Sequence, residues 1–127
     1  MAEVKRVERP LSPHLSIWHW QIHAITSILT RITGNGLIIS ALLSVWWLLA
    51  AATSDSQFAI ANAVVTSWFG DLAFTASAWA LWFHYLAGLR HLYFDAGHGL
   101  DMKTAEKLSW AVVIGSFVLT ILTIFIV

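Results

Sequence analysis

Three long apolar runs dominate this 127-residue chain and limit what it can fold into. We expect membrane spans at about residues 28–52, 71–93 and 106–127. Each is close to the roughly 20 residues that an α-helix needs to cross a hydrocarbon core about 30 Å thick. The predicted fold class is therefore an all-α integral membrane protein, a single domain (1–127) with three transmembrane helices.

The composition supports lipid as the solvent. Only 11% of the residues are charged, against about a quarter in a soluble domain, and 58% are hydrophobic. The formal net charge of zero excludes a general electrostatic attraction to nucleic acid. The absence of cysteine excludes disulfides, iron–sulfur ligation and thiolate metal sites within this chain, so the six histidines are the candidate metal ligands.

The basic residues predict the orientation. All seven precede or open the first span, lie at the end of the second, or lie between the second and third: Lys5, Arg6, Arg9, Arg31, Arg90, Lys103 and Lys107. The loop between the first and second spans contains Asp55 and Asp71 but no basic residue. The positive-inside rule then places the amino terminus in the cytoplasm, or in the matrix of a mitochondrion, and the carboxyl terminus outside.

The segment before the first span is expected to be interfacial. It lacks the apolar core of a secretory signal, and Glu3 and Glu8 break the acid-poor pattern of a transit peptide, which favours a bacterial inner membrane. Residues 10–24 contain two prolines, three histidines and two tryptophans, and we expect a short helix on the membrane surface there. The mildly amphipathic loop 52–70 is expected to form another short surface helix.

His84 is a polar residue inside a membrane span, where such a side chain is energetically unfavourable. It lies about six residues, or roughly 9 Å of helix rise, from the boundary marked by Arg90 and His91. A polar side chain at that depth needs a partner, a cavity or a cofactor. His84 either holds two helices together through a hydrogen bond to a neighbouring helix or is an axial haem ligand. We favour the haem ligand. The other spans contain no histidine, so a six-coordinate haem would take its second ligand from another protein.

Ser27 and Arg31 form a second candidate site. Their i, i+4 spacing puts them on one helix face at the inner end of the first span. Arg31 could simply extend to the lipid headgroups. Beside the Ser27 hydroxyl and Trp20, it could instead build a quinone pocket, with donors for the carbonyl oxygens and a cation that stabilises negative charge during reduction.

The loop after the second span holds Asp95, His98 and Asp101. These groups could relay protons or bind a metal. We favour helix capping, with Gly97 and Gly99 shaping the turn.

Three segments together resemble the cytochrome b subunit of succinate dehydrogenase, one of the two membrane anchors of respiratory complex II. They are RPLSPHLSIW at 9–18, SILTRITG at 27–34 and HYLAGLRHLYFDAGHG at 84–99. The resemblance covers nearly the whole chain from about Arg9, with the motifs in the family's order and spacing. The pattern S-x-x-x-R-x-x-G followed by H-x-x-x-G-x-R-H-x-x-x-D is specific in combination.

The resemblance implies that His84 is the axial ligand of haem b and therefore the metal-binding residue. It also implies that Arg31 lies near the haem propionates, with Arg90 and His91 as further propionate contacts. Many family members have a histidine directly before the motif arginine, where this chain has Thr30. No role of that histidine is therefore carried over.

The resemblance further implies a ubiquinone site lined by Trp20, Ser27, Ile28 and Arg31. The partners it implies are a flavoprotein subunit, an iron–sulfur subunit and a second three-helix anchor that supplies the other haem histidine. This chain would be a subunit of succinate dehydrogenase that passes electrons from the iron–sulfur subunit to ubiquinone, with no dehydrogenase active site of its own. The alternatives are a haem b anchor of a fumarate reductase or another respiratory enzyme, or a non-redox membrane protein such as a small transporter or assembly factor.

Overall fold

The computed structural model describes residues 9–126, and these fold into four α-helices and no strand. The helices are α1 (Ile22–Thr53), α2 (Asp55–Val65), α3 (Trp68–Asp95) and α4 (Met102–Ile126). Three of them, α1, α3 and α4, are long and apolar enough to cross a membrane. A helix satisfies its backbone hydrogen bonds within one segment, as lipid requires. The predicted all-α class with three transmembrane helices is confirmed.

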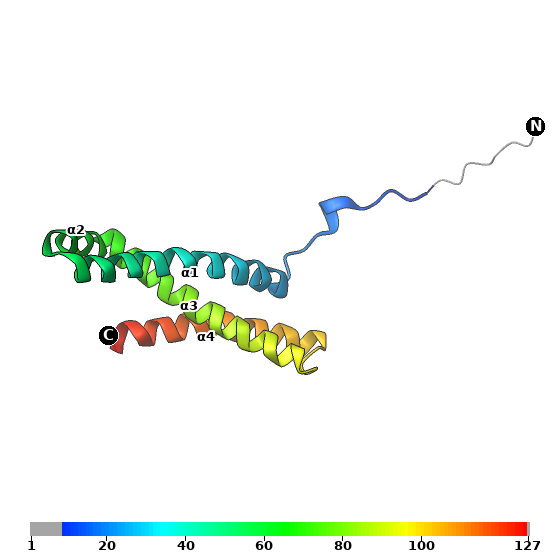
Figure 1. The fold of residues 1–127 in the computed structure, drawn as a ribbon. Helices are drawn as coiled ribbons and strands as arrows, with labels where there is room; N and C mark the ends of the chain where they lie inside the picture. Colours follow the sequence, from blue (N-terminus) through cyan, green and yellow to red (C-terminus); the bar gives the residue numbers. More distant parts are fainter. Residues whose placement is uncertain (1–8, 127) are drawn as a thin grey trace, which may run out of the picture.

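The chain crosses the bundle three times, and α3 packs against both α1 and α4 (Figure 1). The short helix α2 lies beside the end of α1 and the beginning of α3, and the carboxyl end of α4 lies at this same end of the bundle (Figure 1). The opposite end carries the basic side chains Arg31, Arg90, Lys103 and Lys107, and Arg9 lies in the segment that leads to it. Lys5 and Arg6 lie outside the described residues.

Residues 9–21, which precede α1, extend away from the bundle (Figure 1). Within residues 9–21 the only helical part is one 3-10 turn, His14–Ile17, none of whose residues is buried. The short surface helix expected within residues 10–24 is therefore reduced to this turn. The two prolines give the reason, because proline lacks the amide donor and holds the preceding residue in an extended conformation.

Serine caps begin the two helices around the first connection. Ser54 Oγ accepts a hydrogen bond from the Gln57 amide (3.3 Å) at the start of α2, and Ser67 Oγ accepts one from the Gly70 amide (3.2 Å) at the start of α3. Such caps satisfy amide groups that have no partner in the first turn. The surface helix expected between residues 52 and 70 is confirmed as α2.

Most of the side chains buried between the long helices are small, and Phe83 is the large apolar exception. The buried core consists of Phe83, Ala87 and Val112, whereas most large apolar side chains point outward. Between α1 and α3, Ser40 Oγ and Ser77 Oγ are hydrogen-bonded at 2.6 Å. Lipid gives no hydrophobic drive for helices to associate, so close packing of small residues and hydroxyl contacts takes its place. The outer surface is left apolar, as lipid or a neighbouring helix requires.

The α3–α4 loop is built by caps. Gly97, at φ 79°, donates its amide hydrogen to the Phe94 carbonyl (2.9 Å), and His98 donates its own to the Tyr93 carbonyl (3.2 Å), the pattern of a Schellman motif. Asp101 Oδ2 accepts the Thr104 amide (2.9 Å) at the start of α4. Among residues 9–126, no three His, Asp or Glu side chains lie close enough to hold a metal ion. The capping interpretation is confirmed for Asp101.

Replacing Asp101 by alanine should lower the thermal midpoint of the protein at neutral pH, because the first turn of α4 loses its cap. The hydrogen bond from the Thr104 backbone lowers the pKa of Asp101. Its charged form therefore contributes stability above the ordinary aspartate pKa of about 3.9, and this stability is lost as the pH falls through the lowered value. Melting curves of wild type, Asp101→Ala and Asp101→Asn against pH test this. Asp101→Asn keeps a neutral hydrogen-bond acceptor, so its thermal midpoint at low pH should stay above that of Asp101→Ala.

Candidate functional site

His84 lies in α3 and faces α1. Its Nδ1 is 3.0 Å from the carbonyl oxygen of Thr30 and 3.4 Å from Thr33 Oγ1, both on α1. The side chain is half-buried. The histidine in the second span therefore contacts the neighbouring helix through one of its two ring nitrogens.

The partner of Nδ1 determines which nitrogen carries the proton. A carbonyl oxygen only accepts hydrogen bonds, so Nδ1 of His84 must be the donor to Thr30. In a neutral imidazole the other nitrogen, Nε2, then carries a lone pair. Within residues 9–126, Nε2 of His84 makes no hydrogen bond. The ring is thus held by one nitrogen and presents the other as a Lewis base.

Gly34 lies directly against this ring. A Cβ atom placed on Gly34 would be 2.9 Å from Cε1 and 3.3 Å from Nδ1 of His84. Two residues further along α1, a Cβ on Gly36 would meet nothing within 4 Å. The imidazole therefore occupies the space that a side chain at position 34 would fill.

Arg90 is enclosed between the three long helices, with 6% of its surface exposed. Its Nη1 donates to Thr26 Oγ1 on α1 (2.9 Å) and to Ser109 Oγ on α4 (2.6 Å). The guanidinium carbon also lies 5.6 Å from the centre of the Phe94 ring, within the range of a cation–π contact. Arg90 therefore joins α1, α3 and α4 near the end of the bundle that carries the basic residues.

Ser27 and Arg31 lie on the first turns of α1, where Ser27 is half-buried and Arg31 is exposed. Ile28 is 40% exposed. These three side chains belong to the outer face of α1, beside the inward-facing Thr26. They are open to an arriving ligand or to another subunit.

Trp20 lines a pocket of about 400 Å³ at the same end of the molecule. The start of α1 and the start of α4 form this pocket, whose lining residues are Trp20, Gln21, Ile22, His23, Met102, Glu106 and Trp110. Ser27 and Arg31 do not line it. Within the described residues, the four side chains expected at the quinone site are thus near one another along the chain but do not enclose a single cavity.

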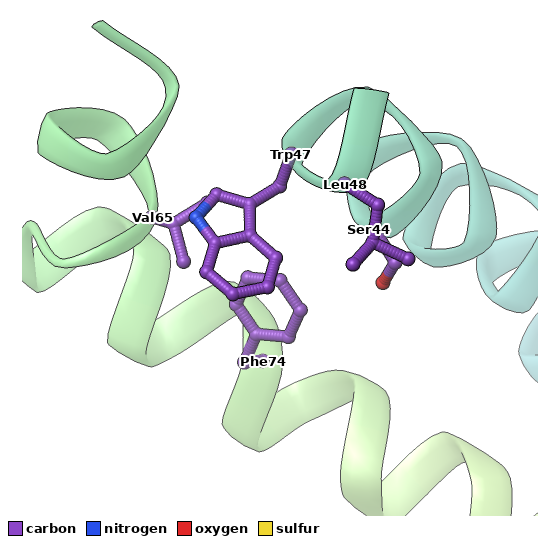
Figure 2. A pocket seen from close by; sticks show the side chains of 5 residues that line it. All are labelled: Ser44, Trp47, Leu48, Val65 and Phe74. Atoms are coloured by element: carbon purple, nitrogen blue, oxygen red, sulfur yellow. The ribbon is translucent and has the colours of Figure 1, made fainter. Parts of the chain in front are cut away.

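A second pocket, of about 280 Å³, lies at the opposite end between α1, α2 and α3. Figure 2 shows the rings of Trp47 and Phe74 on its wall, with Ser44, Leu48 and Val65 completing the lining. The Trp47 indole donates to Asn62 Oδ1 (3.4 Å), outside that lining. The pocket offers one hydroxyl and no charged group, which is too little to bind both carbonyls of a quinone.

Two other histidines lie near the basic end of the bundle, His91 on α3 and His23 on α1. His91 is exposed, two turns from His84 and nearer the basic end. His23 Nε2 hydrogen-bonds Gln21 Oε1 (2.7 Å), and both residues line the Trp20 pocket. Thr30 donates its hydroxyl to the Thr26 carbonyl (2.7 Å).

The donor chemistry at His84 fits a haem iron. Histidines that bind metals usually donate their other ring N–H to a carbonyl or carboxylate, which fixes the tautomer and the ring orientation. His84 has this arrangement, with Nδ1–H on a backbone carbonyl and Nε2 free.

The reasoning from sequence did not identify Gly34, the Thr30 carbonyl, or Thr26 and Ser109 as parts of this region. Gly34 was visible as the last residue of the S-x-x-x-R-x-x-G pattern. No signal in the sequence marks a backbone carbonyl as a hydrogen-bond acceptor, because every residue has one.

The chain resembles known proteins along almost its entire length. Residues 5–123 match the family described as succinate dehydrogenase/fumarate reductase transmembrane subunit. The succinate dehydrogenase cytochrome b556 subunit of Paracoccus denitrificans is 53% identical over 126 residues, covering 99% of this chain and 97% of that protein. The corresponding subunit of Rickettsia conorii is 35% identical over 115 residues, covering 91% and 90%.

A mitochondrial relative is also found. The succinate dehydrogenase cytochrome b560 subunit of Bos taurus is 33% identical over 112 residues, which cover 85% of this chain and 65% of that protein. The resemblance inferred from the three motifs is thereby confirmed. The chain belongs to the succinate dehydrogenase/fumarate reductase transmembrane subunit family, as a membrane-anchoring cytochrome b subunit of succinate dehydrogenase that does not itself hold the dehydrogenase active site.

Proposed function

We propose that this subunit holds haem b through Nε2 of His84 and contributes part of a ubiquinone site, so that electrons pass from the iron–sulfur subunit to ubiquinone. The observation that carries the proposal is the hydrogen bond from His84 Nδ1 to the Thr30 carbonyl at 3.0 Å. It leaves Nε2 unprotonated, with a lone pair available to iron, on a half-buried side chain. The names of the relatives, which are cytochrome b subunits, support haem b as the cofactor.

The haem, when bound, supplies a one-electron carrier inside the membrane. The contribution of this chain is to hold the imidazole at a fixed angle and tautomer and to surround it with apolar helix surfaces. A second histidine for the haem would come from a partner, a second three-helix anchor. In residues 9–126 no other histidine lies at a comparable depth in a helix. Of the propionate contacts, Arg31 and His91 are exposed and free to reach a carboxylate, whereas Arg90 already binds two hydroxyl groups.

The quinone site is proposed on the exposed face of α1 near the basic end. Ser27 donates a hydrogen bond to one quinone carbonyl, Arg31 offsets the negative charge that develops on reduction, and Ile28 supplies apolar contact. Trp20 lies just before α1 and forms an aromatic wall. The open position of Ser27 and Arg31 supports a site that is completed by another subunit.

The proposed partners are therefore a flavoprotein subunit, an iron–sulfur subunit and the second anchor. The soluble subunits dock at the basic end, which we place in the cytoplasm by the positive-inside rule. The amino terminus is then cytoplasmic and the carboxyl terminus periplasmic, in a bacterial inner membrane. The bacterial relatives support this location.

Replacing Arg31 by alanine should impair quinone reduction much more than succinate oxidation by a soluble dye. The guanidinium stabilises charge only on the quinone, and loss of one such group costs about 10²–10³-fold in rate at comparable sites. The measurement is a pair of activity assays on the purified complex, with succinate and either a ubiquinone analogue or the dye as acceptor.

The matched control for this assay is Lys107→Ala, which removes an exposed cation from the same end of the molecule, on α4. It should leave both activities near wild type. An equal loss of both activities in Arg31→Ala would show a failure of assembly, and unchanged quinone reduction would remove Arg31 from the site.

A further inference from the structure

We propose that Gly34 is the positioning residue for His84: its missing side chain makes the space in which the imidazole reaches the Thr30 carbonyl and turns Nε2 outward. The expected effect on haem binding rests on the proposed function. The contact between Gly34 and the His84 ring does not. It adds to the haem site a residue that touches the ring without binding the iron.

The contact is close and specific. A Cβ on Gly34 would lie 2.9 Å from Cε1, 3.3 Å from Nδ1 and 3.8 Å from Nε2 of His84. No other side chain or backbone atom is among the three nearest to that position. An alanine there would be in conflict with the imidazole and with nothing nearer, so the ring would have to move by a few tenths of an ångström.

Helix geometry explains why position 34 matters to the carbonyl of position 30. In an α-helix the amide of residue i+4 points at the carbonyl of residue i, so Gly34 stands directly over the Thr30 oxygen. That oxygen has two lone pairs. One serves the helix, and the other is reached by His84 Nδ1–H only where the residue above it has no Cβ to obstruct the ring.

The helix that carries the ring is held in place by its buried neighbours. His84 belongs to α3, whose neighbouring residues Phe83 and Ala87 are fully buried in the core. A displaced imidazole would lose the 3.0 Å bond to Thr30 and change the angle at which Nε2 meets the iron. Loss of an orienting partner of a metal ligand typically weakens metal binding about 10–100-fold.

The test uses the intact complex, purified from membranes, with Gly34→Ala and the control Gly36→Ala. Both add one methyl group to the same helix two residues apart, but only the first meets His84. We expect Gly34→Ala to lose haem to a scavenger protein on the order of tenfold faster and to show an altered low-spin haem spectrum. Gly36→Ala should match wild type in both. A Gly34→Ala complex with wild-type spectrum and haem retention would overturn the proposal.

A double-mutant cycle separates this contact from general damage to the helix. Without the imidazole, the methyl group at position 34 has room, so Gly34→Ala should lower the thermal midpoint of the wild-type complex but not that of the His84→Ala complex. An equal decrease in both backgrounds would show that the methyl group conflicts with something else, and the proposal would be wrong. If the wild-type complex contains no haem, the proposed function fails, yet this cycle still decides whether Gly34 seats His84.

Discussion

Replacing His84 by leucine is expected to abolish the low-spin, bis-histidine haem spectrum of the purified complex. Leucine preserves the bulk and the apolar character of the position but offers no lone pair to iron. The ligand proposed for the partner subunit would by itself hold at most a five-coordinate haem, whose absorption bands and magnetic signals differ from those of a six-coordinate one. The measurement is a reduced-minus-oxidised difference spectrum, normalised to the amount of assembled complex.

His91→Leu is the matched control for this experiment, because His91 lies on nearly the same face of α3, two turns away, and is exposed. It should retain the six-coordinate spectrum. A His84→Leu complex with an unchanged spectrum would exclude His84 as the ligand. The same spectrum, recorded for the wild type, distinguishes a haem b anchor of succinate dehydrogenase or of another respiratory enzyme from a non-redox membrane protein.

Replacing Arg90 by alanine is expected to destabilise the bundle by about 2–4 kcal/mol. The substitution removes two hydrogen bonds from a charged donor, each worth about 1.5–3 kcal/mol, and leaves a cavity. These contributions are not additive, because all three helices share the one side chain. The measurement is denaturation of the complex in detergent, monitored by helix content.

Arg90→Met is the informative companion to this variant. Methionine keeps most of the volume, and the two hydroxyl groups keep partners, since Thr26 Oγ1 also donates to the His23 carbonyl (3.2 Å) and Ser109 Oγ to the Ala105 carbonyl (2.8 Å). We expect Arg90→Met to be clearly more stable than Arg90→Ala. Equal stability of wild type and Arg90→Ala would show that the guanidinium does not join the helices.

The haem midpoint potential of Arg90→Met decides the second role proposed for this arginine. A guanidinium that contacts a propionate raises the potential, because it offsets negative charge beside the iron. An unchanged potential would assign Arg90 to the packing of the helices alone. A lowered potential would restore it as a propionate contact in the assembled complex.

The contrast between Arg90 and Arg31 shows where sequence reasoning ends. Both are single arginines near the same end of a predicted span, and periodicity treats them alike. The structure encloses Arg90 between three helices and leaves Arg31 exposed. The difference depends on which face of each helix meets a neighbour, and the apolar stripe that reveals this in a soluble helix is absent when every face is apolar.

The N-terminal segment shows the opposite case, in which local sequence overruled a pattern. The aromatic and histidine residues before α1 indicated a surface helix, but two prolines limit helical structure there to the turn His14–Ile17. The caps at Ser54, Ser67 and Asp101 are equally local, and each begins a helix where its side chain can accept an amide hydrogen.

The sequence by itself determined the three spans, their basic end and the presence of His84 inside the second span, because these follow from hydropathy and charge along the chain. The tertiary structure alone decided which nitrogen of His84 is free, since that depends on a backbone carbonyl 54 residues away. It alone brought Gly34 against the His84 ring, where a Cβ atom would be 2.9 Å from Cε1. Contacts between helices in lipid are made by small residues and hydroxyl groups, and these carry no periodic signal that a sequence can display.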